Sequence, residues 1–254
     1  DLEAAMDNTG KFTGKGAVYA AARPRYAEEL LAYLADEAGL APGALVADVG
    51  SGTGIFSEQL LDAGFRVIGV EPNDDMRTQA EHTLGGREGY RSVRGTADAT
   101  GLPDASIGCV TAAQAFHWFD ADKFREECKR LLTPDGRVAI VYNSRMNGAI
   151  SAPRDEIFRR YCPEFNEHRG HMGIRSDTDG DLFLKNEYFS SVEVFQMETP
   201  VMMTREEFIG NSLSKSYSLV ETDPNYKAFV TELRELFDKY HRYGKVAASY
   251  TTNC

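Results

Sequence analysis

Leu-Val-Ala-Asp-Val-Gly-Ser-Gly-Thr-Gly, residues 45–54, decides how this chain is organised. Residues 45–49 form a nearly continuous apolar run, which is typical of a parallel strand covered on both faces. The glycines that follow remove the Cβ atoms that would keep a ligand away from the backbone. Apolar residues then recur at helical spacing, at Ile55, Phe56, Leu60 and Leu61. The stretch predicts a buried strand, a glycine loop open to a ligand, and a helix whose N-terminus offers unpaired N–H groups.

A second strand strengthens this interpretation because it ends in an acid. Residues 66–70, Arg-Val-Ile-Gly-Val, are followed directly by Glu71. An acid at the end of the next strand, roughly 20 residues after the glycine loop, is placed to accept hydrogen bonds from both hydroxyls of a ribose. The alternative is a structural turn followed by a solvated Glu71. We expect the loop and Glu71 to hold one adenosine cofactor.

The spacing of the glycines separates two classes of adenosine cofactor. A dinucleotide fingerprint reads Gly-x-Gly-x-x-Gly, but here Ile55 stands where the last glycine belongs and Gly54 comes one residue earlier. The spacing therefore disfavours NAD. Residues 48–54, together with Val-Glu-Pro at 70–72, resemble the first two motifs of class I S-adenosylmethionine-dependent methyltransferases. The resemblance implies S-adenosyl-L-methionine as the cofactor, bound by Asp48, Gly50, Ser51, Gly52, Thr53, Glu71 and Pro72.

The loop after the predicted third strand, residues 90–94, is expected to reach the adenine. In the family that the motifs resemble, the residues just after this strand contact the base, and Ala97 and Asp98 occupy that stretch. Asp98 is a candidate because the exocyclic amine of adenine donates hydrogen bonds and a carboxylate accepts them. A loop acid that faces water is the alternative for Asp98.

The loop after the predicted fourth strand, residues 107–113, carries the only tryptophan of the chain. Ligands bind beside the point where strand order reverses, and in the resembled family the first and fourth strands flank that point. Gln-Ala-Phe-His-Trp-Phe at residues 114–119 resembles this loop in the type-11-like branch, which includes trans-aconitate methyltransferase-like proteins. We expect Gln114 to contact the cofactor and Trp118 the substrate. His117 is the candidate general base, and the alternative is a histidine that orients the loop or the substrate.

Residues 19–26, Tyr-Ala-Ala-Ala-Arg-Pro-Arg-Tyr, resemble the N-terminal lid of the same branch, which folds over the cofactor. The resemblance implies that Arg23 pairs with the methionine carboxylate and that Tyr19 and Tyr26 enclose the reacting centre. The alternative is a set of surface arginines with the tyrosines packed under them. A methyl acceptor that is already a carboxylate, as the branch suggests, needs cations instead of a base. The candidate cations are Arg23, Arg25 and Arg145.

Beyond residue 142 the pattern changes. A polar stretch rich in turn formers precedes an alternating strand at residues 192–199, a capping box that begins at Thr204, and an amphipathic helix at residues 222–240. We expect the helices of this region to cover the site as a cap that selects the acceptor. A plain packing role for their apolar faces is the alternative. A final strand is expected at residues 246–252.

The expected fold class is α/β: a Rossmann-like, doubly wound, mostly parallel seven-stranded sheet with an antiparallel edge strand and a helical cap. Residues 1–254 are expected to form a single methyltransferase domain. Within it we expect an N-terminal lid and helix at residues 1–40, a cofactor-binding core at 41–142, and a cap at 143–245 that contributes one core strand, at about 192–199.

The composition and charge of the chain indicate which classes of partner, among nucleic acids, membranes and metals, are disfavoured. A formal net charge of −11 disfavours nucleic acid, because non-specific binding to it needs a basic surface. No apolar run approaches the ~18 residues of a membrane-spanning helix, and the first residues do not resemble a signal sequence, so we expect a cytoplasmic protein. The four cysteines include no Cys-x-x-Cys pair. Reduced thiols and no metal are therefore expected, with a disulfide or a metal site as the alternative.

These patterns together predict an S-adenosylmethionine-dependent methyltransferase that acts on a small molecule, with a carboxylic acid as the acceptor that the resemblance implies. Methyl transfer is an in-line displacement, so alignment of acceptor, methyl and sulfur dominates and no covalent nucleophile is required. The alternative is a cofactor-binding protein of the same fold that transfers nothing.

Overall fold

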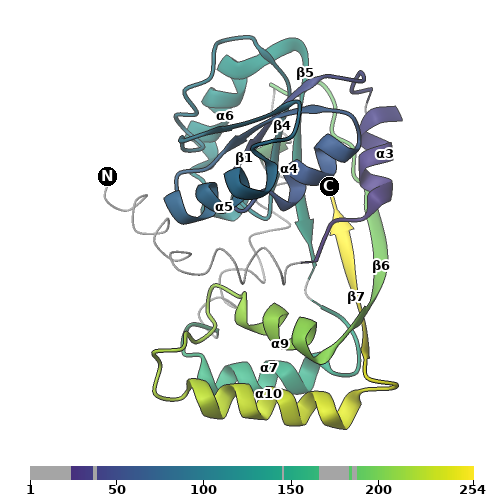
Figure 1. Ribbon diagram of the computed structural model, residues 1–254. Helices are drawn as coiled ribbons and strands as arrows, with labels where there is room; N and C mark the ends of the chain where they lie inside the picture. Colours follow the sequence, from purple (N-terminus) through teal and green to yellow (C-terminus); the bar gives the residue numbers. More distant parts are fainter. Residues whose placement is uncertain (1–23, 37–38, 145, 166–182, 185–187) are drawn as a thin grey trace.

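The computed structural model describes residues 24–36, 39–144, 146–165, 183–184 and 188–254. Within these ranges one seven-stranded sheet has the order β3-β2-β1-β4-β5-β7-β6 (Figure 1). Its strands are β1 (Leu45–Val49), β2 (Arg66–Val70), β3 (Tyr90–Val93), β4 (Ile107–Ala113), β5 (Leu132–Asn143), β6 (Gln196–Met203) and β7 (Val246–Asn253). The strands from β3 to β5 are all parallel, whereas β7 is antiparallel to both of its neighbours. The predicted fold class is confirmed, with β7 lying one position inside the edge strand β6.

The first strand lies at the centre of the parallel part of the sheet. β1 pairs with β2 on one side and with β4 on the other, so the strand order reverses beside it. Val46 packs in the hydrophobic cluster on one face of the sheet, and Ala47 packs in the cluster on the other face. Burial on both faces explains why the sequence of β1 is apolar except for Asp48, instead of alternating.

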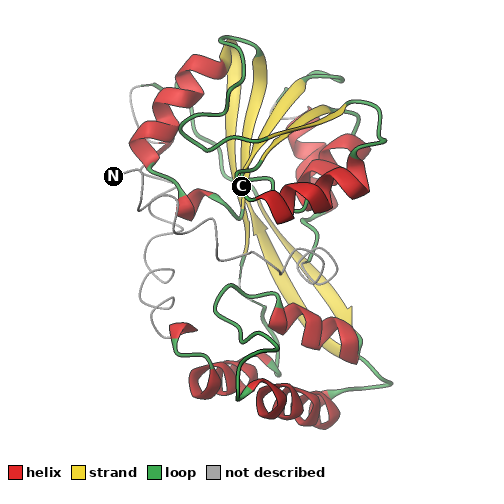
Figure 2. Ribbon diagram, turned by 60° about the vertical axis from the view of Figure 1, so that its left-hand side comes forward, coloured by secondary structure: helices red, strands yellow, loops and turns green. Residues whose placement is uncertain are grey.

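Helices cover both faces of the parallel strands, as Figure 2 shows. One face carries α3 (Glu28–Asp36), α4 (Ile55–Asp62) and the end of α5 (Asp74–Leu84), whose apolar residues share a single cluster. The opposite face carries α6 (Ala121–Leu131), which buries Phe124, Cys128 and Leu131. The sheet is therefore the middle of three layers, and the loops at the carboxyl ends of its strands remain at one rim.

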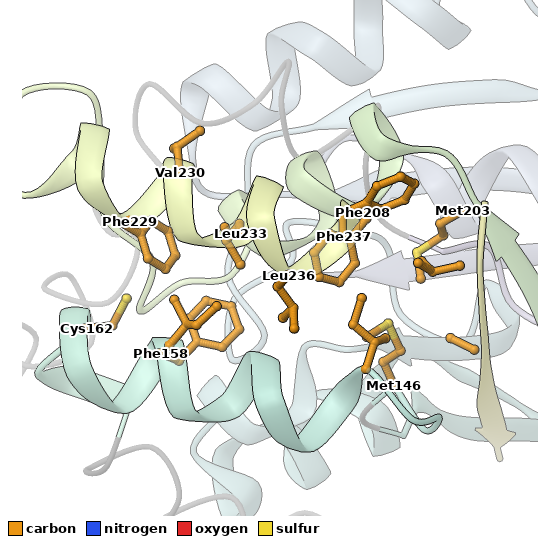
Figure 3. Close-up of a cluster of buried hydrophobic side chains, with 14 of the residues drawn as sticks. Met146, Phe158, Cys162, Met203, Phe208, Phe229, Val230, Leu233, Leu236 and Phe237 are labelled. Atoms are coloured by element: carbon orange, nitrogen blue, oxygen red, sulfur yellow. The ribbon is translucent and has the colours of Figure 1, made fainter. Parts of the chain in front are cut away.

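The remaining helices form a cap with a hydrophobic core of its own. It consists of α7 (Ser151–Tyr161), α9 (Arg205–Leu213) and α10 (Tyr226–Tyr240). In Figure 1 the cap lies beyond the carboxyl end of β5, and β6 and β7 extend from the sheet towards it. Figure 3 shows Phe158 of α7 and Cys162, just after the helix, facing Phe229 and Leu233 of α10. The predicted capping box is confirmed at the start of α9, where Thr204 and Glu207 bond reciprocally.

The predicted position of the sixth strand was wrong by several residues. The strand was expected at residues 192–199, but β6 spans Gln196–Met203 and Val194 is 70% exposed. Pro200 lies inside β6, opposite Ser249. Because β6 is the edge strand, a residue without an N–H breaks no ladder there.

Two other boundaries also differ from the expectation. The helix predicted at residues 222–240 begins only at Tyr226, because residues 220–226 form a turn in which the Val220 N–H donates to the Asp223 carboxylate over 3.0 Å. Residues 133–136, Thr-Pro-Asp-Gly, have a composition typical of a turn but lie within β5, where the pairing with β4 shifts register. The division of the chain into lid, core and cap stays a prediction.

Candidate functional site

The three glycines of the loop between β1 and α4 all have positive φ, for different reasons. A Cβ on Gly50 would lie 2.6 Å from the Cβ of Ala115, and a Cβ on Gly54 would lie 2.7 Å from Cδ1 of Leu84. Around Gly52, with φ +56°, no atom of the described chain would come within 4 Å of an added Cβ. Gly50 and Gly54 are therefore required by packing. Gly52 leaves the backbone open to an approaching ligand.

Glu71 meets the glycine loop directly. Its Oε2 accepts a hydrogen bond from the Gly52 N–H over 2.9 Å, and its Oε1 accepts one from the Asn73 N–H over 2.8 Å. The side chain is buried, and this burial raises the pKa of Glu71 even though both backbone bonds favour the ionised form. The two parts of the predicted cofactor motif, on neighbouring strands, thus occupy one place at the carboxyl rim of the sheet.

Asp48 lies under the loop instead of on its open side. Its Oδ2 accepts a hydrogen bond from Ser57 Oγ over 2.6 Å, and its Oδ1 accepts one from Thr111 Oγ1 over 2.9 Å. The residue is 1% exposed, and burial raises the pKa of Asp48 to about 6. Asp48 therefore joins β1 to α4 and β4, and it supports the loop from beneath.

The other loop residues fit the nucleoside-bearing cofactor. Ser51 shapes the bend, since its N–H donates to the Val70 carbonyl over 3.2 Å and its carbonyl accepts from the Gly54 N–H over 2.9 Å. Thr53 is 5% exposed, and its Oγ1 has no hydrogen-bond partner in the described parts of the chain. Pro72 is half-buried beside Glu71. An open backbone, an unpaired hydroxyl and a carboxylate at one rim match the donors and acceptors of S-adenosyl-L-methionine.

The predicted adenine-contacting residues form a tight turn after β3. Thr96 and Ala99 bond to each other through their backbones, and Thr96 Oγ1 donates to the Asp98 carboxylate over 2.7 Å. Ala97 packs against the cluster on the α6 face, whereas Asp98 is exposed. The turn is preformed, and the Asp98 carboxylate still has acceptor capacity on the exposed side.

A group that the sequence did not reveal fixes this turn to α6. Glu127 Oε1 accepts hydrogen bonds from the N–H and Oγ1 of Thr100, over 2.9 and 2.5 Å. Both oxygens of Glu127 also accept from Arg130, which holds the pKa of Glu127 at about 2. The i, i+3 spacing of Glu127 and Arg130 was visible in the sequence, but their link to Thr100 was not.

The loop after β4 begins with a strained residue. Gln114 has φ +55°, which is uncommon outside glycine, and its side-chain amide donates to the Asn143 carbonyl over 2.9 Å. The chain then forms a short 3₁₀ turn, Phe116–Trp118. His117 is exposed on this turn, and its ring centroid lies 4.8 Å from that of Trp118. Gln114, His117 and Trp118 are thus brought to the end of β4, beside the reversal of strand order.

Asn143 and Thr252 form a junction that sequence reasoning missed. Thr252 Oγ1 donates to Asn143 Oδ1 over 2.6 Å and accepts from the Ala27 N–H over 3.0 Å. Asn143 Nδ2 donates to the Arg25 carbonyl over 3.1 Å. These bonds tie the N-terminal segment to the ends of β5 and β7. An asparagine at the end of a strand gave a weak signal, whereas nothing in the sequence pointed to Thr252.

The predicted lid residues are only partly described. Tyr19, Arg23 and Arg145 lie outside the described residues. Tyr26 is buried with its ring centroid 5.0 Å from that of Phe56, and Arg25 pairs with Glu58 over 2.6 Å. For Tyr26 and Arg25 this geometry favours the packing alternative.

The described residues were compared with the patterns of metal sites, membrane-spanning helices and disulfide bonds. Among the described residues no group of His, Cys, Asp and Glu is arranged to hold a metal ion. No helix in that part of the chain is long and apolar enough to span a bilayer. Within the described residues, Cys109, Cys128, Cys162 and Cys254 form no disulfide bond.

Known proteins with this sequence pattern and fold are methyltransferases. Residues 47–140 match the family model described as a methyltransferase domain. An uncharacterized methyltransferase of Mycobacterium tuberculosis is 30% identical over 205 residues, which cover 79% of this chain and 74% of that protein. A candidate type II methyltransferase from Anaeromyxobacter dehalogenans has the same fold, with a TM-score of 0.65 at 24% identity over 91% of this chain and 94% of that one.

A second solved structure supports the same fold. A candidate S-adenosyl-L-methionine-dependent methyltransferase from Methanococcus maripaludis matches with a TM-score of 0.52 at 18% identity, covering 77% of this chain and 88% of that one. The strand order, the meeting of Gly52 with Glu71 and the methyltransferase relatives all agree. The chain therefore belongs to the class I S-adenosylmethionine-dependent methyltransferases, with S-adenosyl-L-methionine as its cofactor.

Proposed function

We propose that this methyltransferase acts on a small molecule and that the acceptor is a carboxylic acid. The observation that carries the proposal is the cap, whose helices α7, α9 and α10 have their own core beside the carboxyl end of β5. A cap in this position can enclose a small acceptor, whereas a nucleic acid substrate needs an open and basic surface. The net charge of −11 supports the same choice.

The proposed cofactor contacts come from the loops after four strands. Glu71 holds the ribose, and Gly52 with the glycine loop packs against the methionine part of the cofactor. Asp48 acts from beneath the loop and Gln114 from the end of β4. The meeting of Gly52 and Glu71 over 2.9 Å supports the first pair. The other proposed cofactor-binding residues are Arg23, Gly50, Ser51, Thr53, Pro72, Ala97 and Asp98.

The main contribution to methyl transfer that we assign to the chain is the alignment of cofactor and acceptor. S-adenosyl-L-methionine supplies a methyl group activated by the positive charge on its sulfur. The protein holds cofactor and acceptor in line and excludes water, which accounts for much of the rate of such a displacement. Tyr19, Tyr26, Trp118 and Arg145 are the proposed substrate residues, although burial of the Tyr26 ring against Phe56 favours a supporting role for Tyr26.

His117 has two proposed roles that depend on the acceptor. With an acceptor that loses a proton on attack, His117 takes that proton as the general base, and its exposed position beside Trp118 gives it access. With an acceptor that is already a carboxylate, no base is needed, and His117 orients the loop instead. The carboxylate then requires a cation.

Two broader proposals follow from the sequence. The Gln-Ala-Phe-His-Trp-Phe loop supports membership of the trans-aconitate methyltransferase-like branch. Four cysteines without a disulfide bond in the described residues fit a reducing compartment such as the cytoplasm.

The test is methyl transfer to an unbiased set of acceptors. Purified protein is incubated with methyl-labelled S-adenosyl-L-methionine and a small-molecule metabolite extract, and products heavier by CH₂ are identified by mass spectrometry. The proposal expects a labelled methyl ester. Label confined to added RNA, DNA or protein would refute the small-molecule acceptor.

The alternative is a cofactor-binding protein of this fold that transfers nothing. It predicts tight binding of S-adenosylhomocysteine in calorimetry with no labelled product from any acceptor. A His117→Ala variant would then bind the cofactor product like the wild type and show no other change.

A further inference from the structure

The first turn of α7, in the cap, contains an arginine with an unusual environment. Arg154 is 3% exposed, yet none of its contacts is a short bond to a carboxylate. Its Nη1 lies 3.5 Å from the Met146 Sδ and 3.5 Å from Asn211 Oδ1, and its Nη2 lies 3.9 Å from the Asp155 carboxylate. Its Nε has no hydrogen-bond partner among the residues that the structure describes.

Such an arrangement is costly for a guanidinium. Arginine stays protonated in proteins and carries five N–H donors that suit a planar oxyanion. A buried charge is normally paired and fully hydrogen-bonded, because the loss of water is otherwise not offset. Here the near partners are a thioether, a neutral amide and the ring of Phe158, whose centroid lies 5.6 Å from Cζ. The carboxylate of Asp155 is at the limit of an ion pair. Arg154 therefore has unused capacity for an anion.

A second observation at the same turn points to an anion as well. The Oγ of Ser151, the first residue of α7, is buried and unpaired within the described ranges. The helix has no acidic residue in its first turn and no side-chain cap on its N-terminus. The Arg154 guanidinium contacts Met146, which precedes the helix, and also lies over the ring of Phe158, one turn further along α7. The helix dipole is positive at the end of α7 that Met146 adjoins.

The turn is connected to the methyl-transfer end of the sheet. Met146, which contacts Arg154, follows Asn143 by three residues, and the Asn143 carbonyl accepts the side-chain hydrogen bond of Gln114. Figure 3 shows Met146 beside the start of α7. Met146 is unbranched and flexible, so its thioether can move away from the guanidinium when a stronger acceptor approaches. The interior of the cap here is also polar, since Asn211, Ser212 and Ser214 are all buried.

We propose that Arg154, Ser151 and the N-terminus of α7 form an anion subsite for the acidic group of the methyl acceptor. This inference rests on the proposed small-molecule function and deepens it, because it names an oxyanion, a carboxylate or a phosphate, as the group recognised. The oxyanion binds the Nε edge of the guanidinium, where it accepts the free Nε–H and an Nη2–H, and it also accepts the Ser151 hydroxyl. The subsite supplies the cation that Arg25, paired with Glu58, does not.

The first test needs no substrate and distinguishes an arginine that binds a ligand from one that stabilises the fold. Arg154→Met replaces the guanidinium by an apolar chain of similar length, and Arg159→Met, on the exposed side of α7, is the matched control. An underpaired buried cation predicts that Arg154→Met has an unchanged or higher Tm, because the desolvation penalty disappears. A clearly lower Tm than the control would overturn the proposal, since it would mean that Arg154 serves the fold.

The second test uses inorganic phosphate and citrate as probes in calorimetry and thermal-shift measurements. Both probes test the oxyanion, and their relative effect separates a phosphate from a carboxylate site. The wild type and Arg159→Met are expected to be stabilised by one of them, and Arg154→Met is expected to lose that shift. Equal shifts in all three proteins, or none in the wild type, would refute the subsite.

The third test links the subsite to turnover. The metabolite extract is divided by anion exchange into anionic and neutral fractions, with a portion of the anionic one treated with phosphatase. Label is expected in the anionic fraction, and Arg154→Met is expected to lower incorporation about 100-fold while S-adenosylhomocysteine binds unchanged. Label in the neutral fraction would overturn the subsite but not the small-molecule function. Absence of label throughout would count against that function, and the first two tests would still decide the subsite.

Discussion

The two ends of the sheet are built differently. β1 pairs with β2 along its whole length and is flanked by β4, so the cofactor loop stands on a continuous and buried ladder. At the other end β7 pairs with β6 along its length but with β5 only at Tyr142 and Asn143. The cap is therefore carried by a two-stranded ribbon with a short junction to the sheet. The cofactor end is held by a continuous ladder. The cap end is held by a few backbone bonds, such as that from the Ser144 N–H to the Thr251 carbonyl, and by the side chains of Asn143 and Thr252.

The polar groups follow the same division. Asp48 and Glu71 at the cofactor end have both carboxylate oxygens bonded. In the described part of the cap, Arg154 Nε and Ser151 Oγ have no partner. The comparison suggests a rule for this protein: the buried carboxylates of the cofactor end are preorganised, whereas the acceptor end completes its bonding with the acceptor. Thr53 Oγ1, unpaired within the described residues, is the exception at the cofactor end. The following changes test that rule.

The largest effect is expected at Gly50. Gly50→Ala adds a methyl 2.6 Å from the Cβ of Ala115 at a positive φ, so backbone strain of about 1 kcal/mol and overpacking of up to about 3 kcal/mol combine. We expect a loss of about 4 kcal/mol in unfolding free energy and no measurable binding of S-adenosylhomocysteine. Gly43 also has a positive φ, but an added Cβ would meet nothing within 4 Å, so Gly43→Ala should lose only the part of the unfolding free energy that backbone strain costs. Equal losses would mean that the loop does not depend on packing against Ala115.

Asp48 gives a pH-dependent effect. Burial raises the pKa of Asp48 from 3.8 to about 6, so its ionisation opposes folding. The stability contributed by the protonated form is complete below the unfolded value and is lost as the pH rises through the folded value. Asp48→Asn should thus match the wild type near the unfolded pKa and exceed its unfolding free energy by about 3 kcal/mol at neutral pH. Urea unfolding at both pH values measures this difference.

The control for Asp48 is Asp98→Asn, which removes an exposed carboxylate and should show no such dependence. A variant Asp48→Asn that is less stable than the wild type at neutral pH would show that the ionised carboxylate is a net stabiliser under the loop.

The junction between sheet and cap is tested at Thr252. Thr252→Val leaves the Ala27 N–H and Asn143 Oδ1 unpaired in a buried site, so a loss of about 2 kcal/mol is expected. Its neighbour gives the control, because Thr251→Val changes a partly exposed side chain on the same strand. Limited proteolysis should cut the N-terminal segment faster in Thr252→Val alone. If both variants behave alike, the junction is not held by this side chain.

The smallest effect is expected at Glu71. Glu71→Gln keeps the side-chain oxygen near Gly52 but removes the charge that a ribose hydroxyl would meet, so S-adenosylhomocysteine should bind roughly tenfold more weakly. Glu88→Gln makes the same charge change on an exposed loop and should leave the affinity unchanged. Calorimetry that gives equal affinities for all three proteins would remove Glu71 from the cofactor site.

The prediction from sequence was strongest where chemistry and local structure coincide. The glycine loop, the strand before it and the acid after β2 were readable because each depends on neighbours in the chain. The sixth strand was misplaced because the position of an edge strand depends more on pairing with its neighbour, here β7, than on the alternation of its own residues. Glu127 and Thr252 were missed because their partners are 27 and 109 residues away.

The sequence by itself determined the α/β class and the cofactor, since the spacing of three glycines and one acid sets the backbone path around an adenosine. Only the tertiary structure decided that Asp48 lies beneath the loop, that Tyr26 packs on Phe56 and that Arg154 is buried without a close carboxylate. The physical reason is burial. Whether a charged or polar group is paired depends on atoms that folding brings together from distant parts of the chain.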